Sequence, residues 1–384
     1  MRVGALTLVL ILLLAGCQGA VNPPSPAPLP TAIPVALVAT ATATATLSPP
    51  SVTPAPPTPT ATPRPPTATA TASLPPPSAT PIPPTATPLP PTPTPDAYAA
   101  IDVEGLRRRD YGSGRIETVR VLEEQAAFTR YLIRYPSDGI PITGVMNVPK
   151  GEGPFPVVIV NHGFIQPSSY QTTSAYTLPL ADALARNGYL TLHPDYRNYG
   201  GSGQGPNPFR IGYAIDVLNL VQLAKTLPNA RPDRIGMLGH SMGGGITSRV
   251  LVATPDVKAA VLYGAMSADE VENYNHRRAM GWLRNEASFG DVVPLTPQDR
   301  PDVYERLSPM SHLAYVTAPI SIHHGELDND VPVQFSRRLA QALRDNGKSV
   351  ELFTYPGQPH WLNGAANPLF LQRVVAFFDR TLKA

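Results

Sequence analysis

An apolar strand pattern at residues 234–238 runs directly into Gly239-His240-Ser241-Met242-Gly243 and then into a helix-forming segment. The two outer glycines leave room for a sharp strand-to-helix turn, and Gly244 and Gly245 allow the helix to pack closely on a sheet. Such a turn exposes the serine at the positive end of the helix, where a weakly nucleophilic hydroxyl can be activated by a base. A glycine-rich turn with a chance serine would look the same, so the interpretation depends on partner residues elsewhere in the chain.

The composition of the chain changes sharply near residue 96. Of the 48 prolines, 26 lie between residues 21 and 95, where Arg64 is the single charged residue. Pro, Thr, Ala and Ser dominate residues 17–95, so this segment cannot bury enough apolar surface to offset the entropy of ordering it. We expect a disordered, semi-extended linker that could carry O-linked glycans, with a Pro-rich docking ligand as the alternative. Residues 96–384 suffice for one large α/β domain.

Residues 1–16 combine Arg2, an apolar run from Leu6 to Leu14 and the small residues Ala15-Gly16, directly before the only cysteine, Cys17. This pattern resembles a bacterial lipoprotein signal peptide. The resemblance implies cleavage before Cys17, lipidation of that residue and an extracytoplasmic protein anchored to a bacterial membrane. The alternatives are an ordinary secretory signal and a short membrane anchor. With a single cysteine the domain cannot form an internal disulfide, so its stability must come from packing.

The charges of the globular part are balanced. All 28 acidic residues and 28 of the 30 basic residues lie beyond residue 95. Without a basic patch or an acidic tail, the sequence gives no reason to expect a nucleic-acid partner. We also expect neither a metal nor a cofactor, because the candidate chemistry below needs none.

The globular part begins with alternating patterns typical of antiparallel strands over residues 116–149. Strand and helix patterns then alternate, which predicts a doubly wound parallel sheet. The expected strands are 155–160, 189–192, 234–238, 257–263, 320–324 and 350–355, and the expected helices are 178–186, 211–227, 242–253, 332–345 and 368–383. Residues from about 265 to 315 break this alternation. We interpret them as a helical cap insertion over the serine, with a purely structural wall as the alternative.

A serine nucleophile needs a base and an acid that orients the base. His360 follows the expected strand 350–355 across a short turn and comes after Ser241 in the chain, which makes it the preferred base. Three carboxylates follow the expected strand 320–324. Asp328 is preferred because it lies close to the strand end, whereas Asp330 lies nearer the next helix and is expected to cap it. Glu326 is the third candidate.

Two backbone N–H groups are also needed to accept the negative charge that develops on the substrate oxygen. The amide of Met242, next to the serine, is one candidate. The amide of Phe164, which follows Asn161-His162-Gly163 at the end of the first parallel strand, is the other.

Taken together, these segments resemble the α/β-hydrolase fold, and residues 155–384 resemble the catalytic domain of the prolyl oligopeptidase family and its dienelactone-hydrolase-like relatives. The matching sequences are Asn161-His162-Gly163-Phe164, residues 195–202, 239–245, 308–311, 318–332 and 355–360. The resemblance implies a triad of Ser241, Asp328 and His360, with the amides of Phe164 and Met242 as oxyanion donors. It also implies that Asp195 and Arg197 brace the loop after their strand.

One departure from the family limits the inference about substrate. Oligopeptidases of this family carry a β-propeller, but only about 60 residues separate the linker from the first parallel strand here, which is too few for one. We therefore expect cleavage of small carboxylic esters through an acyl-enzyme. Cleavage of short peptides is the first alternative, and a non-catalytic surface binding protein on the same fold is the second. The sequence does not indicate the oligomeric state.

Overall fold

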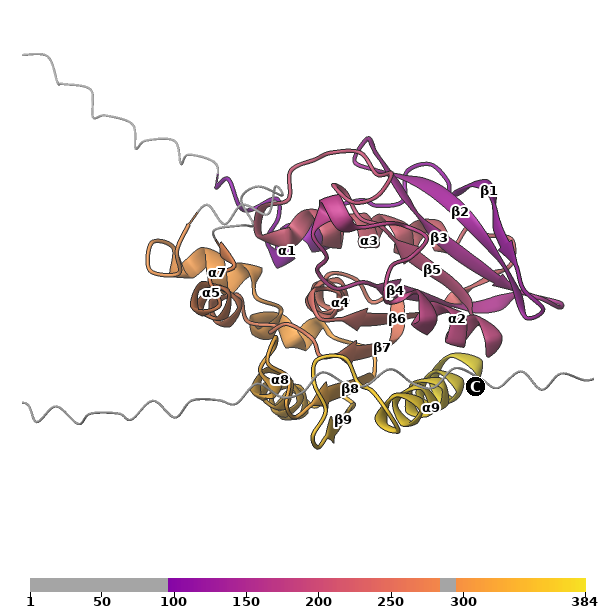
Figure 1. Cartoon of the computed structure of the whole chain (residues 1–384). Helices are drawn as coiled ribbons and strands as arrows, with labels where there is room; N and C mark the ends of the chain where they lie inside the picture. The colour runs from indigo at the N-terminus through magenta and orange to yellow at the C-terminus, as the bar shows by residue number, and fades with distance from the viewer. Residues whose placement is uncertain (1–95, 284–294) are drawn as a thin grey trace, which may run out of the picture. The chain divides into compact units, whose positions relative to one another are not determined.

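The computed structural model describes residues 96–283 and 295–384 (Figure 1). The expected signal peptide at 1–16, the lipidated Cys17 and the linker at 17–95 lie outside these residues, as does the middle of the expected cap, 284–294. Among the described helices, none combines the length and the apolar character needed to cross a bilayer.

Nine strands within the described ranges form one sheet in the order β1-β2-β3-β5-β4-β6-β7-β8-β9. β1 to β3 pair in antiparallel fashion, β3 also pairs antiparallel with β5, and every pair from β5 through β9 is parallel. The strands are β1 (Glu117–Glu124), β2 (Phe128–Ser137), β3 (Ile140–Pro149), β4 (Phe155–Asn161), β5 (Leu190–Pro194), β6 (Ala230–His240), β7 (Val257–Tyr263), β8 (Ile320–Gly325) and β9 (Val350–Tyr355). This confirms the expected sheet, mostly parallel with antiparallel strands at its N-terminal side.

Helices cover both faces of the sheet (Figure 1). They are α1 (Val103–Arg108), α2 (Leu178–Arg186), α3 (Ile211–Ala224), α4 (Met242–Ala253), α5 (Glu270–Ala279), α7 (Pro301–Leu307), α8 (Val333–Asp345) and α9 (Ala366–Phe378). Shorter helical turns are η1 (Pro167–Ser169), η2 (Pro208–Arg210), η4 (Pro309–Tyr315) and η5 (Asp379–Lys383). The expected helix at 368–383 is thus an α-helix ending at Phe378, followed by one wider turn.

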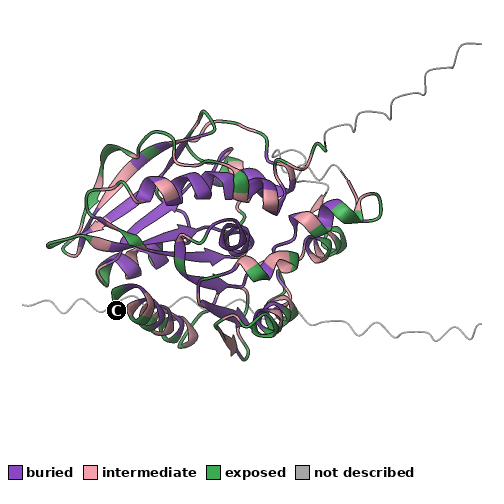
Figure 2. Cartoon of the chain, turned by 180° about the vertical axis from the view of Figure 1, so that it is seen from behind, coloured by how far each residue is buried: buried purple, intermediate pink, exposed green. Residues whose placement is uncertain are grey.

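The continuously apolar strands contribute side chains to two buried hydrophobic clusters, one on each face of the sheet. In β4, Ile159 belongs to the cluster under α3 and α4, whereas its neighbour Val158 belongs to the cluster that packs on α2 and α9. This division follows from the two-residue side-chain period of a strand, and it explains why β4 is apolar at successive positions. Figure 2 shows the result, with buried residues concentrated in the central strands and in the helices that pack on them. Every residue of α4 is buried, so the helix after Ser241 is fixed along its whole length.

Buried polar contacts fix the loop that follows β5. Arg197 Nη2 lies 2.8 Å from Asp216 Oδ1 in α3, and the Arg197 backbone N–H donates to the same carboxylate at 2.8 Å. Asp195 accepts hydroxyl hydrogen bonds from Thr143, Tyr170 and Thr172. These contacts agree with the bracing role that the resemblance implies for Asp195 and Arg197.

Replacing one partner of the buried Arg197–Asp216 pair should destabilise the domain. In Asp216→Ala the guanidinium stays buried and loses its nearest carboxylate, with Asp138 Oδ2 remaining at 3.8 Å, and we expect the free energy of unfolding to fall by about 3–5 kcal/mol. The matched control is Asp233→Ala, which removes a carboxylate with 64% of its side chain exposed beside Arg234 and should cost about 0–1 kcal/mol. Urea unfolding followed by circular dichroism measures both; equal midpoints for the two variants would show that the buried pair does not stabilise the fold.

Candidate active site

Ser241 lies in the turn between β6 and α4 with a strained backbone. Its φ of 55° and ψ of −119° lie in a region that non-glycine residues rarely adopt, at a typical cost of about 1–3 kcal/mol. The Ser241 N–H donates to the carbonyl of Tyr263 in β7 at 3.0 Å, and its carbonyl accepts from Met266 N–H at 3.1 Å. Neighbouring elements therefore hold the serine in this conformation.

The two outer glycines of the motif are needed because the backbones approach closely around the turn. A Cβ added at Gly239 would lie 2.2 Å from the Gly243 carbonyl oxygen, and one at Gly243 would lie 2.2 Å from the Asn161 carbonyl oxygen. Both distances are far shorter than any real contact of a carbon atom. The structure thus gives the glycines the steric role predicted from the sequence.

Asp328, on the loop after β8, has both carboxylate oxygens occupied by hydrogen bonds. Oδ2 accepts from His360 Nδ1 at 2.6 Å and lies 3.0 Å from His324 Nε2. Oδ1 accepts the backbone N–H groups of Asp330 and Val331 at 2.9 and 2.8 Å. Burial alone would raise the pKa of Asp328, but the hydrogen bonds from His324 and His360 outweigh burial and hold that pKa well below its ordinary value. The carboxylate is therefore ionised at neutral pH.

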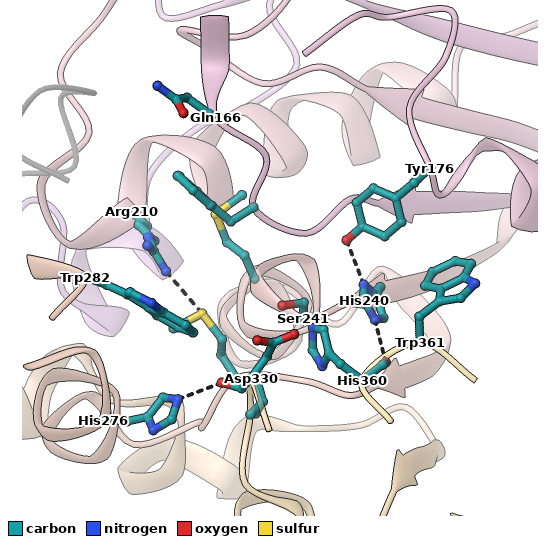
Figure 3. Close-up of a pocket in the computed structure, with 14 residues that line it drawn as sticks. Gln166, Tyr176, Arg210, His240, Ser241, His276, Trp282, Asp330, His360 and Trp361 are labelled. Carbon is teal, nitrogen blue, oxygen red and sulfur yellow. Dashed lines mark hydrogen bonds between the residues drawn. The ribbon is translucent and has the colours of Figure 1, made fainter. Parts of the chain in front are cut away.

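His360, on the loop after β9, is oriented by this carboxylate. Since an ionised carboxylate can only accept, the proton of the neutral imidazole lies on Nδ1, which leaves Nε2 as an acceptor. The side chain is 17% exposed, and His360 and Ser241 line the same cavity (Figure 3). The structure therefore gathers the three residues of the expected triad at one edge of the sheet, although they come from three separate loops.

The cavity beside Ser241 has a volume of about 730 Å³, within the range of small-molecule sites. Its lining is rich in aromatic and methionine side chains. The lining residues are Phe164, Gln166, Tyr176, Arg210, His240, Ser241, Met242, Met266, His276, Trp282, Asp330, Val331, His360 and Trp361. Both expected oxyanion donors, Phe164 and Met242, are in this set. Met266, His276 and Trp282 belong to the expected cap region, which therefore forms one wall of the cavity.

Tyr176 and His240 support the site in a way that the sequence did not reveal. His240 Nε2 lies 3.2 Å from the His360 carbonyl oxygen, so this nitrogen carries the proton and Nδ1 accepts the Tyr176 hydroxyl at 2.7 Å. The same hydroxyl accepts the Gly163 N–H at 3.1 Å. Burial, together with the nearby His360, lowers the pKa of His240 to about 3, so His240 stays neutral and cannot replace His360 as a base near neutral pH.

His324 is a second residue that sequence reasoning placed only at a strand end. Its Nε2 faces two acceptors at 3.0 Å, Asp328 Oδ2 and the Val331 carbonyl oxygen, so this nitrogen carries the proton. Nδ1 then accepts the hydroxyl of Ser336 in α8 at 2.7 Å. A fully buried histidine thus holds the same Asp328 oxygen that His360 contacts. The only sequence signal was its position just before Gly325, which could not indicate this contact.

The expectation that Asp330 caps the next helix is wrong. α8 begins at Val333 with Pro332 as its N-cap residue, and no side chain caps it. The Asp330 carboxylate instead lines the cavity, within 4.8 Å of ligand atoms of Asp328 and His360. These three residues could approach a cation together, but Asp328 and His360 already share a hydrogen bond that such a cation would have to displace.

Comparisons with known proteins agree with this geometry. Residues 181–384 match the model of the prolyl oligopeptidase family. The chain is 24% identical to "Uncharacterized peptidase YtmA" of Bacillus subtilis (strain 168) over 231 residues, which is 60% of this chain and 86% of that protein.

Two solved structures share the fold. The acylaminoacyl peptidase of Pyrococcus horikoshii has a TM-score of 0.56 at 22% identity, covering 67% of this chain and 42% of the peptidase. Acetyl xylan esterase 1 from Thermoanaerobacterium sp. JW/SL YS485 has a TM-score of 0.54 at 17% identity, covering 72% of this chain and 90% of the esterase. The chain thus spans less than half of the Pyrococcus peptidase but nearly the full length of the esterase.

The family match extends over more than half of the chain and includes the strand-to-helix turn at Ser241 and the loops of Asp328 and His360. Peptidases and an esterase occur side by side among the similar proteins. This chain is a serine hydrolase with the α/β-hydrolase fold, and it belongs to the prolyl oligopeptidase family.

Proposed function

We propose that this serine hydrolase cleaves carboxylic esters through an acyl-enzyme, with Ser241 as the nucleophile, His360 as the general base and Asp328 as the residue that orients His360. One observation carries the proposal. A strained Ser241 lines the same cavity as a His360 whose Nδ1 is held by a buried carboxylate at 2.6 Å. This combination supplies a nucleophile, a proton acceptor and a counter-charge for the imidazolium that forms.

In the proposed reaction, Ser241 Oγ forms a bond to the substrate carbonyl carbon while His360 Nε2 takes the hydroxyl proton. The carbonyl oxygen becomes an oxyanion, which the backbone N–H groups of Met242 and Phe164 stabilise. The bond to the alcohol then breaks as His360 returns the proton to the leaving oxygen. Water repeats the sequence on the acyl-enzyme and releases the acid.

Peptide cleavage by the same groups is the first alternative, and the names of the peptidases among the similar proteins favour it. We prefer esters because an alkoxide leaves more readily than an amine, which must be protonated as it departs. A non-catalytic surface binding protein is the remaining alternative.

Replacing the nucleophile should abolish turnover. For Ser241→Ala we expect kcat on p-nitrophenyl butanoate to fall by about 10³- to 10⁶-fold, because the covalent route is lost while binding remains. Labelling by a fluorophosphonate probe should disappear as well. Ser311→Ala, at an exposed serine of η4, is the matched control and should keep both the ester turnover and the labelling by the probe.

The same assays separate the alternatives. Faster turnover of aminoacyl p-nitroanilides than of p-nitrophenyl esters by the wild type would establish the peptidase. Failure of the probe to label folded wild-type protein would favour the binding protein.

Removing the charge of Asp328 should slow the chemistry without removing the nucleophile. In Asp328→Asn the side-chain shape is kept, but the amide allows the wrong His360 tautomer and does not stabilise the imidazolium. We expect kcat to fall by about 10²- to 10⁴-fold with a smaller change in KM. Stopped-flow and steady-state assays measure this effect, with Asp345→Asn at an exposed position of α8 as the control. An unchanged kcat would exclude Asp328 as the orienting acid.

We also propose that lipidation of Cys17 anchors the enzyme to a bacterial membrane, outside the cytoplasm. The support is the sequence of residues 6–17 alone. Wild-type protein should incorporate labelled palmitate and enter the detergent phase of Triton X-114, whereas Cys17→Ser should do neither. Detergent partition that survives Cys17→Ser would indicate an uncleaved apolar anchor, and wild-type protein in the aqueous phase would indicate an ordinary secretory signal.

A further inference from the structure

Asp330 presents a carboxylate to the cavity that the proposed reaction does not use. It lies two residues after Asp328, yet its surroundings differ completely. Its backbone N–H donates to Asp328 Oδ1 at 2.9 Å, and its carbonyl accepts from His276 Nε2 of α5 at 2.7 Å. The main chain is thus held from both sides, while the side chain stays outside these contacts.

In the part of the chain that the structure describes, the Asp330 carboxylate makes no contact that would hold the fold together. α8 starts at Val333 without a side-chain cap. Across residues 96–283 and 295–384, no hydrogen bond or ion pair reaches the Asp330 side-chain oxygens. An exposed surface carboxylate without a partner is ordinary, but this one lines the cavity beside Ser241 and His360.

Figure 3 shows the Asp330 side chain pointing toward the centre of the cavity, next to Ser241 and His360. One carboxylate oxygen lies within 4.8 Å of a His360 ring nitrogen. A negative charge at this place repels anionic substrates. It attracts a cationic group of a substrate whose carbonyl is bound at Ser241. It also opposes the charge of the oxyanion, an effect that a substrate cation next to Asp330 would offset.

The rest of the lining suits a cation as well. The aromatic residues Trp282, Trp361 and Tyr176 line the same cavity, and aromatic rings attract ammonium groups more strongly than aliphatic side chains do. The cationic side chain in the lining is Arg210, whose Nη1 contacts Met266 Sδ at 3.1 Å and whose guanidinium lies 5.9 Å from the Phe164 ring centroid. Figure 3 shows Arg210 directed at the Met266 sulfur.

We propose that Asp330 determines substrate specificity by binding a cationic group, such as a protonated amine, carried close to the scissile carbonyl. This inference rests on the proposed hydrolytic function and narrows its substrates to amino esters and related cationic compounds. Asp330 is a binding residue in this proposal and takes no part in proton transfer.

The test compares two substrate pairs that differ in charge but hardly in shape. On the acyl side, p-nitrophenyl 3-aminopropanoate is compared with p-nitrophenyl butanoate. On the leaving-group side, butyrylthiocholine is compared with 3,3-dimethylbutyl thiobutyrate, with the released thiol measured by Ellman's reagent. The readout is the ratio of kcat/KM for the cationic member to that for the neutral member, because a general loss of activity cancels from this ratio.

For the wild type we expect a ratio of about 10 or more in at least one pair, and for Asp330→Asn a ratio close to 1 in that pair. Asp345→Asn, at an exposed carboxylate of α8, is the matched control and should keep the wild-type ratio. A wild-type ratio near 1 in both pairs would overturn the inference, as would a high ratio that Asp330→Asn leaves unchanged. If the wild type cleaves neither neutral nor cationic esters, the proposed function itself fails, which is a distinct outcome.

Discussion

The left-handed backbone of Ser241 is the constraint from which the site follows. It is kept in place because its N–H and carbonyl are both bonded to segments outside α4, to Tyr263 and Met266. The fully buried α4 prevents the turn from relaxing on the other side. Contacts with β7 and with the first residues of the cap therefore hold the strained residue in place, and the serine remains at the cavity wall.

The parallel sheet explains how residues far apart in the chain reach this hydroxyl. β6, β8 and β9 all end at the same edge, and the loops that follow them carry Ser241, Asp328 and His360. Apart from His360, Asp328 accepts from three donors, His324 Nε2 and the backbone N–H groups of Asp330 and Val331, so its position does not depend on His360 alone. His360 is in turn held by Asp328 through its ring and by His240 through its backbone.

Much of this architecture could be predicted because it depends on local patterns. The strand β7 and the helices α2 and α4 have the predicted bounds, since their apolar periods and flanking turn residues are unambiguous. Candidates for the triad could be chosen from the sequence because chain order and strand ends restrict the choices. Tyr176, His240 and His324 could not be assigned in this way, because their contacts cross between elements that no local spacing relates. The expectation that Asp330 caps α8 is wrong for a similar reason, because it ignored contacts within the loop. Pro332 occupies the N-cap position, and the Asp330 backbone N–H is bonded to Asp328 instead.

Two carboxylates on one loop illustrate how the environment, rather than residue type, assigns chemistry. The carboxylate of Asp328 is surrounded by hydrogen-bond donors, and it orients the imidazole of His360. Asp330 offers the same functional group, but only its main chain is bonded, with its N–H donating to Asp328 and its carbonyl accepting from His276. Its carboxylate is left directed into the cavity. A charge that the protein does not neutralise must be solvated by water or met by a ligand. Because Asp330 lies beside Ser241, a bound substrate excludes water from the Asp330 carboxylate. A cationic substrate compensates for the lost hydration of this carboxylate, whereas a neutral substrate does not.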